Sequence, residues 1–112
     1  MNSKTALVLG TLLFAWTGVS MAEVDADADA AQALMKKSNC GKCHALDKKK
    51  DGPPYKETAK KYLGKADAEQ KLYIHLTTNP KVKVEGKEEE HTSLKTKKEA
   101  EVRNVVRWIL SR

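Results

Sequence analysis

The clearest hydrophobic pattern lies at the C-terminal end of the chain. Apolar side chains recur there at Val102, Val105, Val106, Ile109 and Leu110. Steps of three and four residues place such side chains on one face of a helix. Thr96 and Glu99 have the spacing of a capping box, so we expect this amphipathic helix to begin near Thr96.

Shorter apolar patterns predict three more helices upstream. Asp29 and Gln32 have the spacing of an N-cap residue and its partner, which indicates where the first of them begins. Gly64 ends the second, and the pair Asn79-Pro80 ends the third. The predicted helices cover residues 29–39, 55–63 and 67–78.

The stretch from Pro80 to Lys95 shows no sustained period. Val82 and Val84 alternate as in a strand, but one isolated pair of valines cannot build a sheet. We therefore expect a long loop, and a long loop in so small a domain is usually disordered or functional. The predicted fold class is all-α, with about four helices in one domain over residues 23–112.

The first 22 residues have the features of a secretory signal peptide. Lys4 precedes an apolar run over residues 6–19, and Ser20-Met21-Ala22 offers small residues where a signal peptidase cleaves. We expect cleavage after Ala22, a periplasmic protein and no membrane span in the mature chain. The alternative is a signal that stays uncleaved and anchors the protein.

Few large apolar residues remain after the signal is removed. The aromatic residues of the mature chain are Tyr55, Tyr62, Tyr73 and Trp108. A domain this small commonly needs a disulfide, a metal or a cofactor for stability, and two cysteines form at most one disulfide. A large apolar prosthetic group would complete the core.

The chain is basic. Of its 21 basic residues Lys4 lies in the signal, so the mature protein carries 20 against 15 acidic residues, a formal charge of +5. Such a charge favours solubility and acidic partners. Binding to nucleic acid is not expected, because the sequence has no nucleic-acid-binding motif and the chain is exported.

Both cysteines and one histidine fall within five positions, in the segment Cys40-Gly41-Lys42-Cys43-His44. Cys-x-x-Cys-His in an exported chain is the attachment signature of c-type haem. Sulfurs three residues apart on a tight turn lie along one edge of the porphyrin and form thioethers with its vinyl groups. The next residue then presents its imidazole to the iron. The motif therefore predicts one haem c bound through Cys40 and Cys43, with His44 as an iron ligand.

Two other readings of the cysteine pair have less support. A redox dithiol of the thioredoxin type needs a βαβ setting, which this pattern lacks. A structural zinc site needs a second pair of ligands at close spacing, whereas His75 and His91 are isolated in the sequence.

The chain resembles the class I c-type cytochromes, especially the small bacterial members. The resemblance rests on CGKCH, DGPPYKETAKKY, KLYIHL and EVRNVVRWILSR, in that order along the chain. It implies the class I cytochrome c fold, in which the first and last helices cross closely. Small residues at Ala30, Ala31 and Ala33 would permit that crossing. It also implies that the carbonyl of Pro53 bonds the far nitrogen of His44 and fixes its ring.

One departure from that family concerns the second iron ligand. Such cytochromes usually supply a methionine from the loop before the last helix, and this chain has none there. Met35, the one methionine left after signal removal, precedes Cys40 by five residues and is expected in the core. His91 stands seventeen residues before Trp108, about where the family keeps its ligand. We therefore expect His44 and His91 to bind the iron, with His75, a lysine, water or an open position as alternatives.

Two imidazole ligands leave no iron position for a substrate, which is typical of an electron carrier. The sequence predicts a periplasmic monomer that shuttles single electrons in a respiratory or lithotrophic electron-transfer chain. A chain that oxidises ferrous iron is one such setting. Alternatives are a haem sensor whose distal histidine detaches and a subunit of a larger oxidoreductase. No catalytic triad, acid/base pair or phosphate loop predicts an enzyme.

Expected partners are other redox proteins that dock transiently by charge. Lys42 and residues 48–50 are basic near the proximal histidine, whereas Glu85 and residues 88–90 are acidic before His91. Complementary charge speeds encounters more than it tightens complexes. The alternative interpretation is that these charges only solvate the surface.

Overall fold

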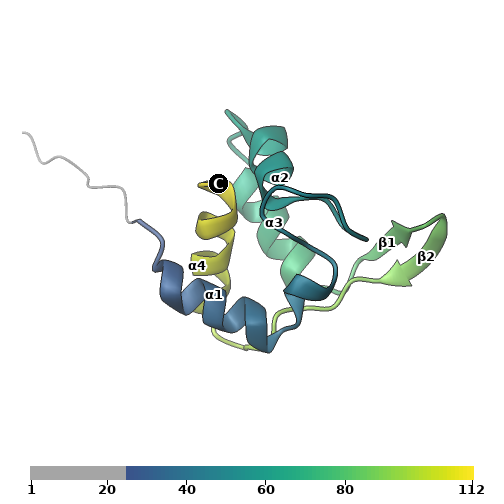
Figure 1. Ribbon diagram of the computed structural model, residues 1–112. Coiled ribbons are helices and arrows are strands. Elements are labelled where there is room, and N and C mark those ends of the chain that lie inside the picture. Colours follow the sequence, from purple (N-terminus) through teal and green to yellow (C-terminus); the bar gives the residue numbers. More distant parts are fainter. Residues whose placement is uncertain (1–24) are drawn as a thin grey trace, which may run out of the picture.

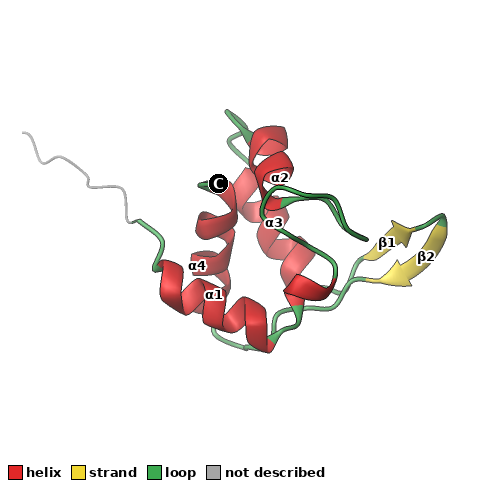
Figure 2. Ribbon diagram, viewed as in Figure 1, coloured by secondary structure: helices red, strands yellow, loops and turns green. Residues whose placement is uncertain are grey.

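The computed structural model describes residues 25–112, so the predicted signal peptide over residues 1–22 lies outside the described residues. Four helices gather on one side of the molecule, and a β-hairpin projects from the other (Figures 1 and 2). The elements are α1 (Ala28–Lys37), a 3-10 turn η1 (Cys40–Lys42), α2 (Tyr55–Tyr62), α3 (Ala68–Thr77), β1 (Lys81–Val84), β2 (Lys87–Glu90) and α4 (Glu99–Leu110).

The C-terminal helix α4 is the centre of the fold, because α1, α2 and α3 each pack against it (Figure 1). Its predicted apolar face is confirmed: Val105 and Val106 are almost fully buried, and only Leu110 on that face is half-exposed. Leu34 and Met35 of α1 and Leu72 and Leu76 of α3 complete the core around it.

The crossing of α1 and α4 depends on one small side chain. Ala31 is 0% exposed in the core cluster beside the valines of α4, and a methyl group there lets the two helices approach closely. Ala30 and Ala33, which were expected at the same crossing, are exposed. They line a groove together with Glu101 and Asn104 of α4, so they lie at the edge of the crossing while Ala31 lies within it.

Both predicted capping residues are displaced by two positions. At the start of α1 the Oδ1 atom of Asp27, not Asp29, accepts a hydrogen bond from the N–H of Ala30, at 3.0 Å. At the other end, α4 begins at Glu99, and Thr96 lies outside it and accepts from the N–H of Lys98 at 3.1 Å. Alternating Ala and Asp offered several equivalent caps for α1, and the tertiary contact of Asp27 decides among them.

That contact joins the start of α1 to the middle of α4. The N–H of Asp27 donates to Oδ1 of Asn104 at 2.8 Å, and Nδ2 of Asn104 donates to the carbonyl of Asp27 at 2.9 Å. One amide side chain thus satisfies both main-chain groups of Asp27, which fixes where the helix begins.

An antiparallel hairpin occupies part of the segment that was expected to be a loop, so that expectation was wrong. Lys81 pairs with Glu90 and Lys83 with Glu88 across the strands, and Lys81 Nζ lies 3.0 Å from Glu88 Oε1. Glu85 and Gly86 have φ values of 50° and 79°, as in the tight turns that join such strands. Cross-strand charge pairs and the turn form the hairpin, and these carry no hydrophobic signal in the sequence.

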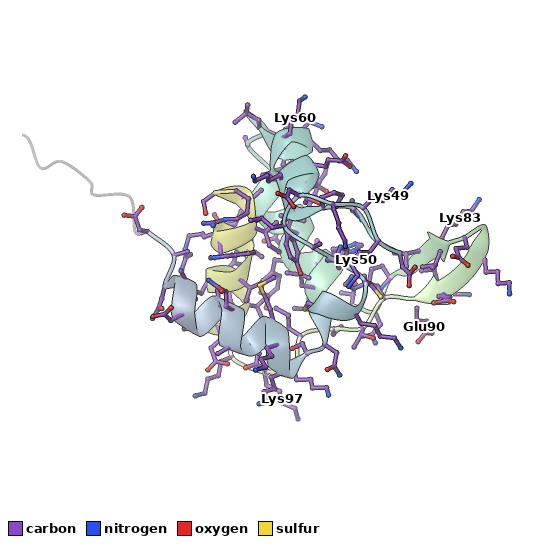
Figure 3. All side chains as sticks on the ribbon, in the orientation of Figure 1. Lys49, Lys50, Lys60, Lys83, Glu90 and Lys97 are labelled. Carbon is purple, nitrogen blue, oxygen red and sulfur yellow. The ribbon has the colours of Figure 1, made fainter. Side chains whose placement is uncertain are left out.

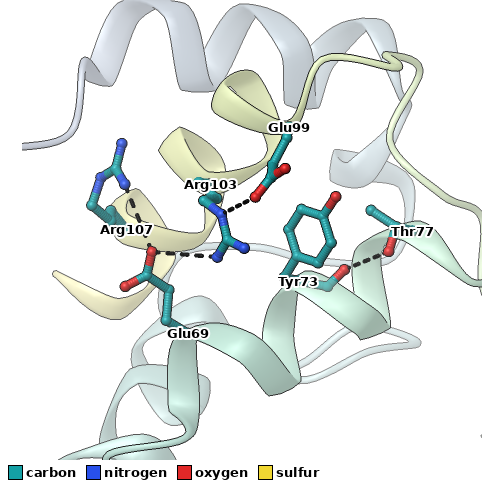
Figure 4. Close-up of polar contacts among 6 residues, drawn as sticks. All are labelled: Glu69, Tyr73, Thr77, Glu99, Arg103 and Arg107. Atoms are coloured by element: carbon teal, nitrogen blue, oxygen red, sulfur yellow. Dashed lines mark hydrogen bonds and ion pairs between the residues drawn. The ribbon is translucent and has the colours of Figure 1, made fainter.

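A network of charged side chains links α3 to α4 (Figure 4). Glu69 Oε1 lies 3.8 Å from Arg103 Nη1 and 3.7 Å from Arg107 Nη1. Arg103 also donates from Nε to Glu99 at 2.7 Å, and its guanidinium lies 4.6 Å from the ring centroid of Tyr73. The network orients α3 on α4, and with it the histidine of α3.

Candidate functional site

The cysteine motif forms a tight turn directly after α1. Asn39 leaves the helix in the left-handed conformation, with φ 58°, and η1 follows. The main-chain N–H groups of Cys43 and His44 both donate to the carbonyl of Cys40, at 3.2 and 3.0 Å. Both thiols are free and partly exposed, and burial raises the pKa of Cys40 above its usual value.

His44 has one nitrogen committed to the protein. Its Nδ1 lies 2.8 Å from the carbonyl oxygen of Pro53, the contact that the sequence resemblance implied. Because a carbonyl can only accept, Nδ1 carries the proton and the lone pair of Nε2 is free for a metal. The N–H of Gly52 donates to the carbonyl of Cys43 at 2.8 Å, which holds the Pro53 loop against the imidazole.

His91 lies at the end of β2, where the hairpin returns to the helices. Its N–H donates to the carbonyl of Pro80 at 2.8 Å, directly beyond the last strand pair. Further along, the N–H of Leu94 donates to the carbonyl of Leu76 at 3.0 Å, and that of Lys95 to the hydroxyl of buried Ser38 at 2.9 Å. The segment is therefore attached to the ends of both α3 and α1.

The three histidines of the chain meet in space. The ring centroids of His44 and His91 are 6.1 Å apart with planes inclined at 52°, and those of His75 and His91 are 4.4 Å apart at 53°. Burial, and then the proximity of His75 and His44, lowers the pKa of His91 to about 4. Burial, and then His44 and Lys61, lowers the pKa of His75. Both rings are accordingly neutral at pH 7.

The contact between His75 and His91 was not foreseen from the sequence. His75, which was expected only as an alternative to His91, is half-buried in the last turn of α3. One feature of the sequence could have indicated this contact. His75 lies near the end of α3, where the chain enters the hairpin, and the hairpin brings the chain back at His91.

A cavity of about 690 Å³ opens beside His44. Apolar and aromatic side chains line much of it, namely Met35, Leu46, Tyr55 and Trp108. Tyr55 stacks on His44 at 5.5 Å and meets Trp108 edge-on at 5.5 Å, and burial raises its pKa. The indole N–H of Trp108 is buried without a partner within residues 25–112. His91 is not among the lining residues, and its ring centroid lies 6.1 Å from that of His44.

The rim of the cavity is basic. Lys36, Lys42 and Arg112 contribute to its lining, and the lining residues include no carboxylate. Leu46, also at the cavity, is 42% exposed; Leu63 and Ile74 are the other large apolar side chains exposed within residues 25–112. The opening thus combines an apolar surface with positive charge.

These residues fit a haem. The cavity has the size and apolar lining of a cofactor site. A metal–imidazole bond is about 2 Å long and the nitrogen lies about 1 Å from the ring centre, so two imidazoles on opposite sides of one iron have centroids about 6 Å apart. The 6.1 Å between His44 and His91 matches that spacing.

The residues fit the two alternative sites less well. Within residues 25–112, no group of three or more His, Cys, Asp and Glu side chains is arranged to hold a bare metal ion. The cysteines lie on a 3-10 turn, and the two described strands form a hairpin rather than a βαβ unit. Structural zinc and a thioredoxin-type dithiol therefore have no support in the fold.

Comparison with known proteins identifies the family. The family described as Cytochrome c matches residues 28–112. This chain belongs to the cytochrome c family. Cytochromes c bind haem c covalently through a pair of cysteines, and Cys40 and Cys43 are the two cysteines of this one.

Relatives and solved structures place the protein among the small class I c-type cytochromes. Cytochrome c-551 of Pseudomonas aeruginosa is 43% identical over 56 residues, covering 50% of this chain and 53% of that protein. Cytochrome c-552 of Hydrogenobacter thermophilus is 49% identical over 39 residues, covering 35% and 40%. The matched segments thus span about half or less of these curated relatives.

The structural similarity is more extensive. The class 1 cytochrome MtoD from Sideroxydans lithotrophicus ES-1 is 51% identical with a TM-score of 0.73, covering 77% of this chain and 96% of that one. Cytochrome c552 of Nitrosomonas europaea is 28% identical with a TM-score of 0.57, covering 71% and 96%. The predicted fold class, a mostly helical class I cytochrome c fold, is confirmed. Within residues 25–112, the cytochrome has no helix long and apolar enough to cross a membrane.

Proposed function

We propose that this cytochrome is a single-electron carrier with one haem c, joined through Cys40 and Cys43 and ligated by His44 and His91. The observation that supports it best is the 6.1 Å spacing of the two imidazoles, together with the bond from His44 Nδ1 to Pro53. Membership of the cytochrome c family supports the electron-transfer role.

The residues of the chain have separate tasks in this proposal. Haem iron, when bound, supplies the one-electron redox couple. His44 presents Nε2 to it while Pro53 holds the ring in one orientation and raises its basicity. His91 would be the second protein ligand, which would leave no iron position for a substrate. Met35, Tyr55 and Trp108 line the cavity and would give the haem an apolar surface to pack against.

Replacing a methionine thioether by imidazole as an iron ligand shifts the reduction potential in a direction that can be predicted. A thioether favours ferrous iron and raises the potential in cytochromes c. A carrier with two histidine ligands therefore has a lower potential than a relative that differs only in a methionine ligand.

Docking is proposed at the basic rim of the cavity, against an acidic surface of a redox partner. Lys36, Lys42 and Arg112 surround the opening, and exposed Leu46 supplies an apolar contact. The acidic surface that was predicted before His91 carries little net charge, because the four glutamates of the hairpin are offset by its three lysines. Figure 3 shows Lys83 and Glu90 together on the hairpin, so steering depends on the rim.

The proposed setting is the periplasm, in a respiratory or lithotrophic chain, with ferrous-iron oxidation among the candidates. Export with cleavage after Ala22 would produce a mature domain over residues 23–112. The cytochrome is proposed to work as a monomer and not as an enzyme.

Mass spectrometry and spectra of protein matured in a host that attaches haem c test the proposal. We expect the mass of the chain from Glu23 plus one haem, and a low-spin ferric signal without a sulfur-to-iron charge-transfer band. The bare mass of the processed chain would overturn haem attachment. The charge-transfer band would overturn ligation by His91.

Carbon monoxide separates a carrier from a sensor. The spectrum of the reduced cytochrome is expected to stay unchanged under carbon monoxide, because His91 keeps the sixth position closed. A shifted spectrum would mean that the ligand detaches on reduction and would favour a sensor.

A further inference from the structure

The ring of His75 lies against that of His91 at a centroid distance of 4.4 Å. No other imidazole in the described part of the chain is so close to His91, since His44 is 6.1 Å away. His75 comes from α3, between Leu72 and Leu76, which anchor that helix in the core. The helix therefore holds the ring of His75 in a fixed position next to His91, the proposed ligand.

The Nδ1 atom of His91 is buried and has no hydrogen-bond partner within residues 25–112. A buried polar atom without a partner destabilises the fold. A histidine that binds a metal through Nε2 almost always donates its other N–H to an acceptor, which fixes the ring and raises its basicity. The main-chain groups near the ring belong to Pro80, whose carbonyl accepts from the N–H of His91, and to Thr92, whose main chain raises the pKa of His91 against the larger lowering by burial.

We propose that His75 is a positioning residue for His91: with the iron bound at Nε2 of His91, Nδ1–H would donate to the adjacent ring of His75, a hydrogen bond that the structure itself does not contain. This inference rests on the proposed ligation by His91. His75 then does on the distal side what the carbonyl of Pro53 does for His44 on the proximal side. A neutral imidazole has one acceptor nitrogen, so the two rings can form one donor–acceptor pair.

The hydrogen bond has two consequences for His91. It makes the imidazole a stronger donor, which favours ferric iron and lowers the reduction potential. It also holds the ring in its binding orientation, so that an external ligand displaces it less readily. Both consequences disappear when the acceptor is removed and return when another acceptor replaces it.

The test uses two variants of the holoprotein, His75→Leu and His75→Gln. Leu keeps an apolar side chain but has no acceptor, whereas the amide oxygen of Gln can accept. For His75→Leu we expect a higher reduction potential and about a 10–100-fold gain in cyanide affinity of the ferric protein. His75→Gln is expected to restore both values most of the way. Unchanged values in His75→Leu, or equal changes in both variants, would overturn the proposal.

A second pair of variants distinguishes positioning from ligation. His91→Ala is expected to lose the low-spin spectrum, because His75 is not itself an iron ligand. A low-spin bis-imidazole spectrum that survives in His91→Ala and disappears only when His75→Ala is added would overturn the positioning role. If the wild-type cytochrome already lacks the bis-imidazole spectrum, the proposed function fails first, independently of His75.

Discussion

Gly52 lies directly against the imidazole of His44. A side-chain carbon on Gly52 would stand 2.3 Å from Cε1 and 2.9 Å from Nε2 of that ring. The N–H of Gly52 donates to the carbonyl of Cys43, so the loop cannot move away without losing a hydrogen bond. The close approach puts the carbonyl oxygen of the next residue, Pro53, within hydrogen-bonding distance of His44 Nδ1.

Gly52→Ala should therefore disturb the proximal site. The added methyl group must displace either the ring or the loop, and such overpacking typically costs about 1–3 kcal/mol. We expect a lower midpoint in denaturant and less haem incorporated per chain, measured by absorbance and mass spectrometry. Asp51→Ala is the matched control, because Asp51 directly precedes Gly52 in the same loop, is exposed and does not line the cavity. Equal losses in both variants would contradict the prediction.

His91→Met should raise the reduction potential, because a thioether stabilises ferrous iron more than imidazole does. A sulfur-to-iron charge-transfer band should appear in the ferric spectrum. Voltammetry and optical spectra measure the two effects. Leu34→Met serves as the control: Leu34 is a core residue that does not line the cavity, so this added methionine should leave the potential unchanged. A His91→Met variant that binds haem normally at an unchanged potential would rule out ligation by His91.

The proposed ligation by His91 should persist in acid until well below neutral pH. In the unfolded chain His91 binds a proton near its ordinary pKa of 6.5, whereas in the fold burial and the nearby His75 lower its pKa to about 4. The unfolded chain binds the proton first as pH falls, so the stability contributed by neutral His91 is complete above pH 6.5 and is lost towards pH 4. Optical titration should show the low-spin spectrum persisting through pH 6.5. Its loss near that pH would contradict the prediction.

Neutralising the rim of the cavity should slow electron exchange with an acidic partner. Lys36 and Lys37 are adjacent in the last turn of α1, but only Lys36 lines the cavity beside His44. Lys36→Gln should lower the bimolecular rate and weaken its dependence on salt, whereas Lys37→Gln should change both less. Stopped-flow mixing with the partner over a range of ionic strength measures this. If the bimolecular rate of the wild-type protein does not depend on salt, electrostatic steering is ruled out.

A substitution at Glu85 should make the turn of the hairpin more stable. Glu85 has φ 50°, a left-handed conformation that costs an ordinary residue about 1–2 kcal/mol and that Asn adopts more easily. Glu85→Asn should slow hydrogen exchange at the amides of β1 and β2, and Glu85→Val should accelerate it. If both variants exchange like the wild type, the turn does not limit the stability of the hairpin.

Much of the helical framework could be predicted from the sequence. The valine face of α4 and the terminators Gly64 and Pro80 are local signals, and each corresponds to an observed boundary or buried face. The cap of α1 was placed wrongly because several aspartates were locally equivalent, and a contact with distant Asn104 decided among them. The hairpin was missed because paired charges and a tight turn form it without a hydrophobic pattern.

The sequence by itself determined the chemistry of the cysteine motif, since the spacing of Cys40, Cys43 and His44 is fixed by the covalent chain. It also determined the helices, because a repeating apolar face is encoded within each segment. Only the tertiary structure decided that His75 and His91 meet beside His44, since the hairpin and the packing of α3 on α4 bring them together. Residues distant in sequence become neighbours through long-range contacts, and no local pattern along the chain encodes those contacts.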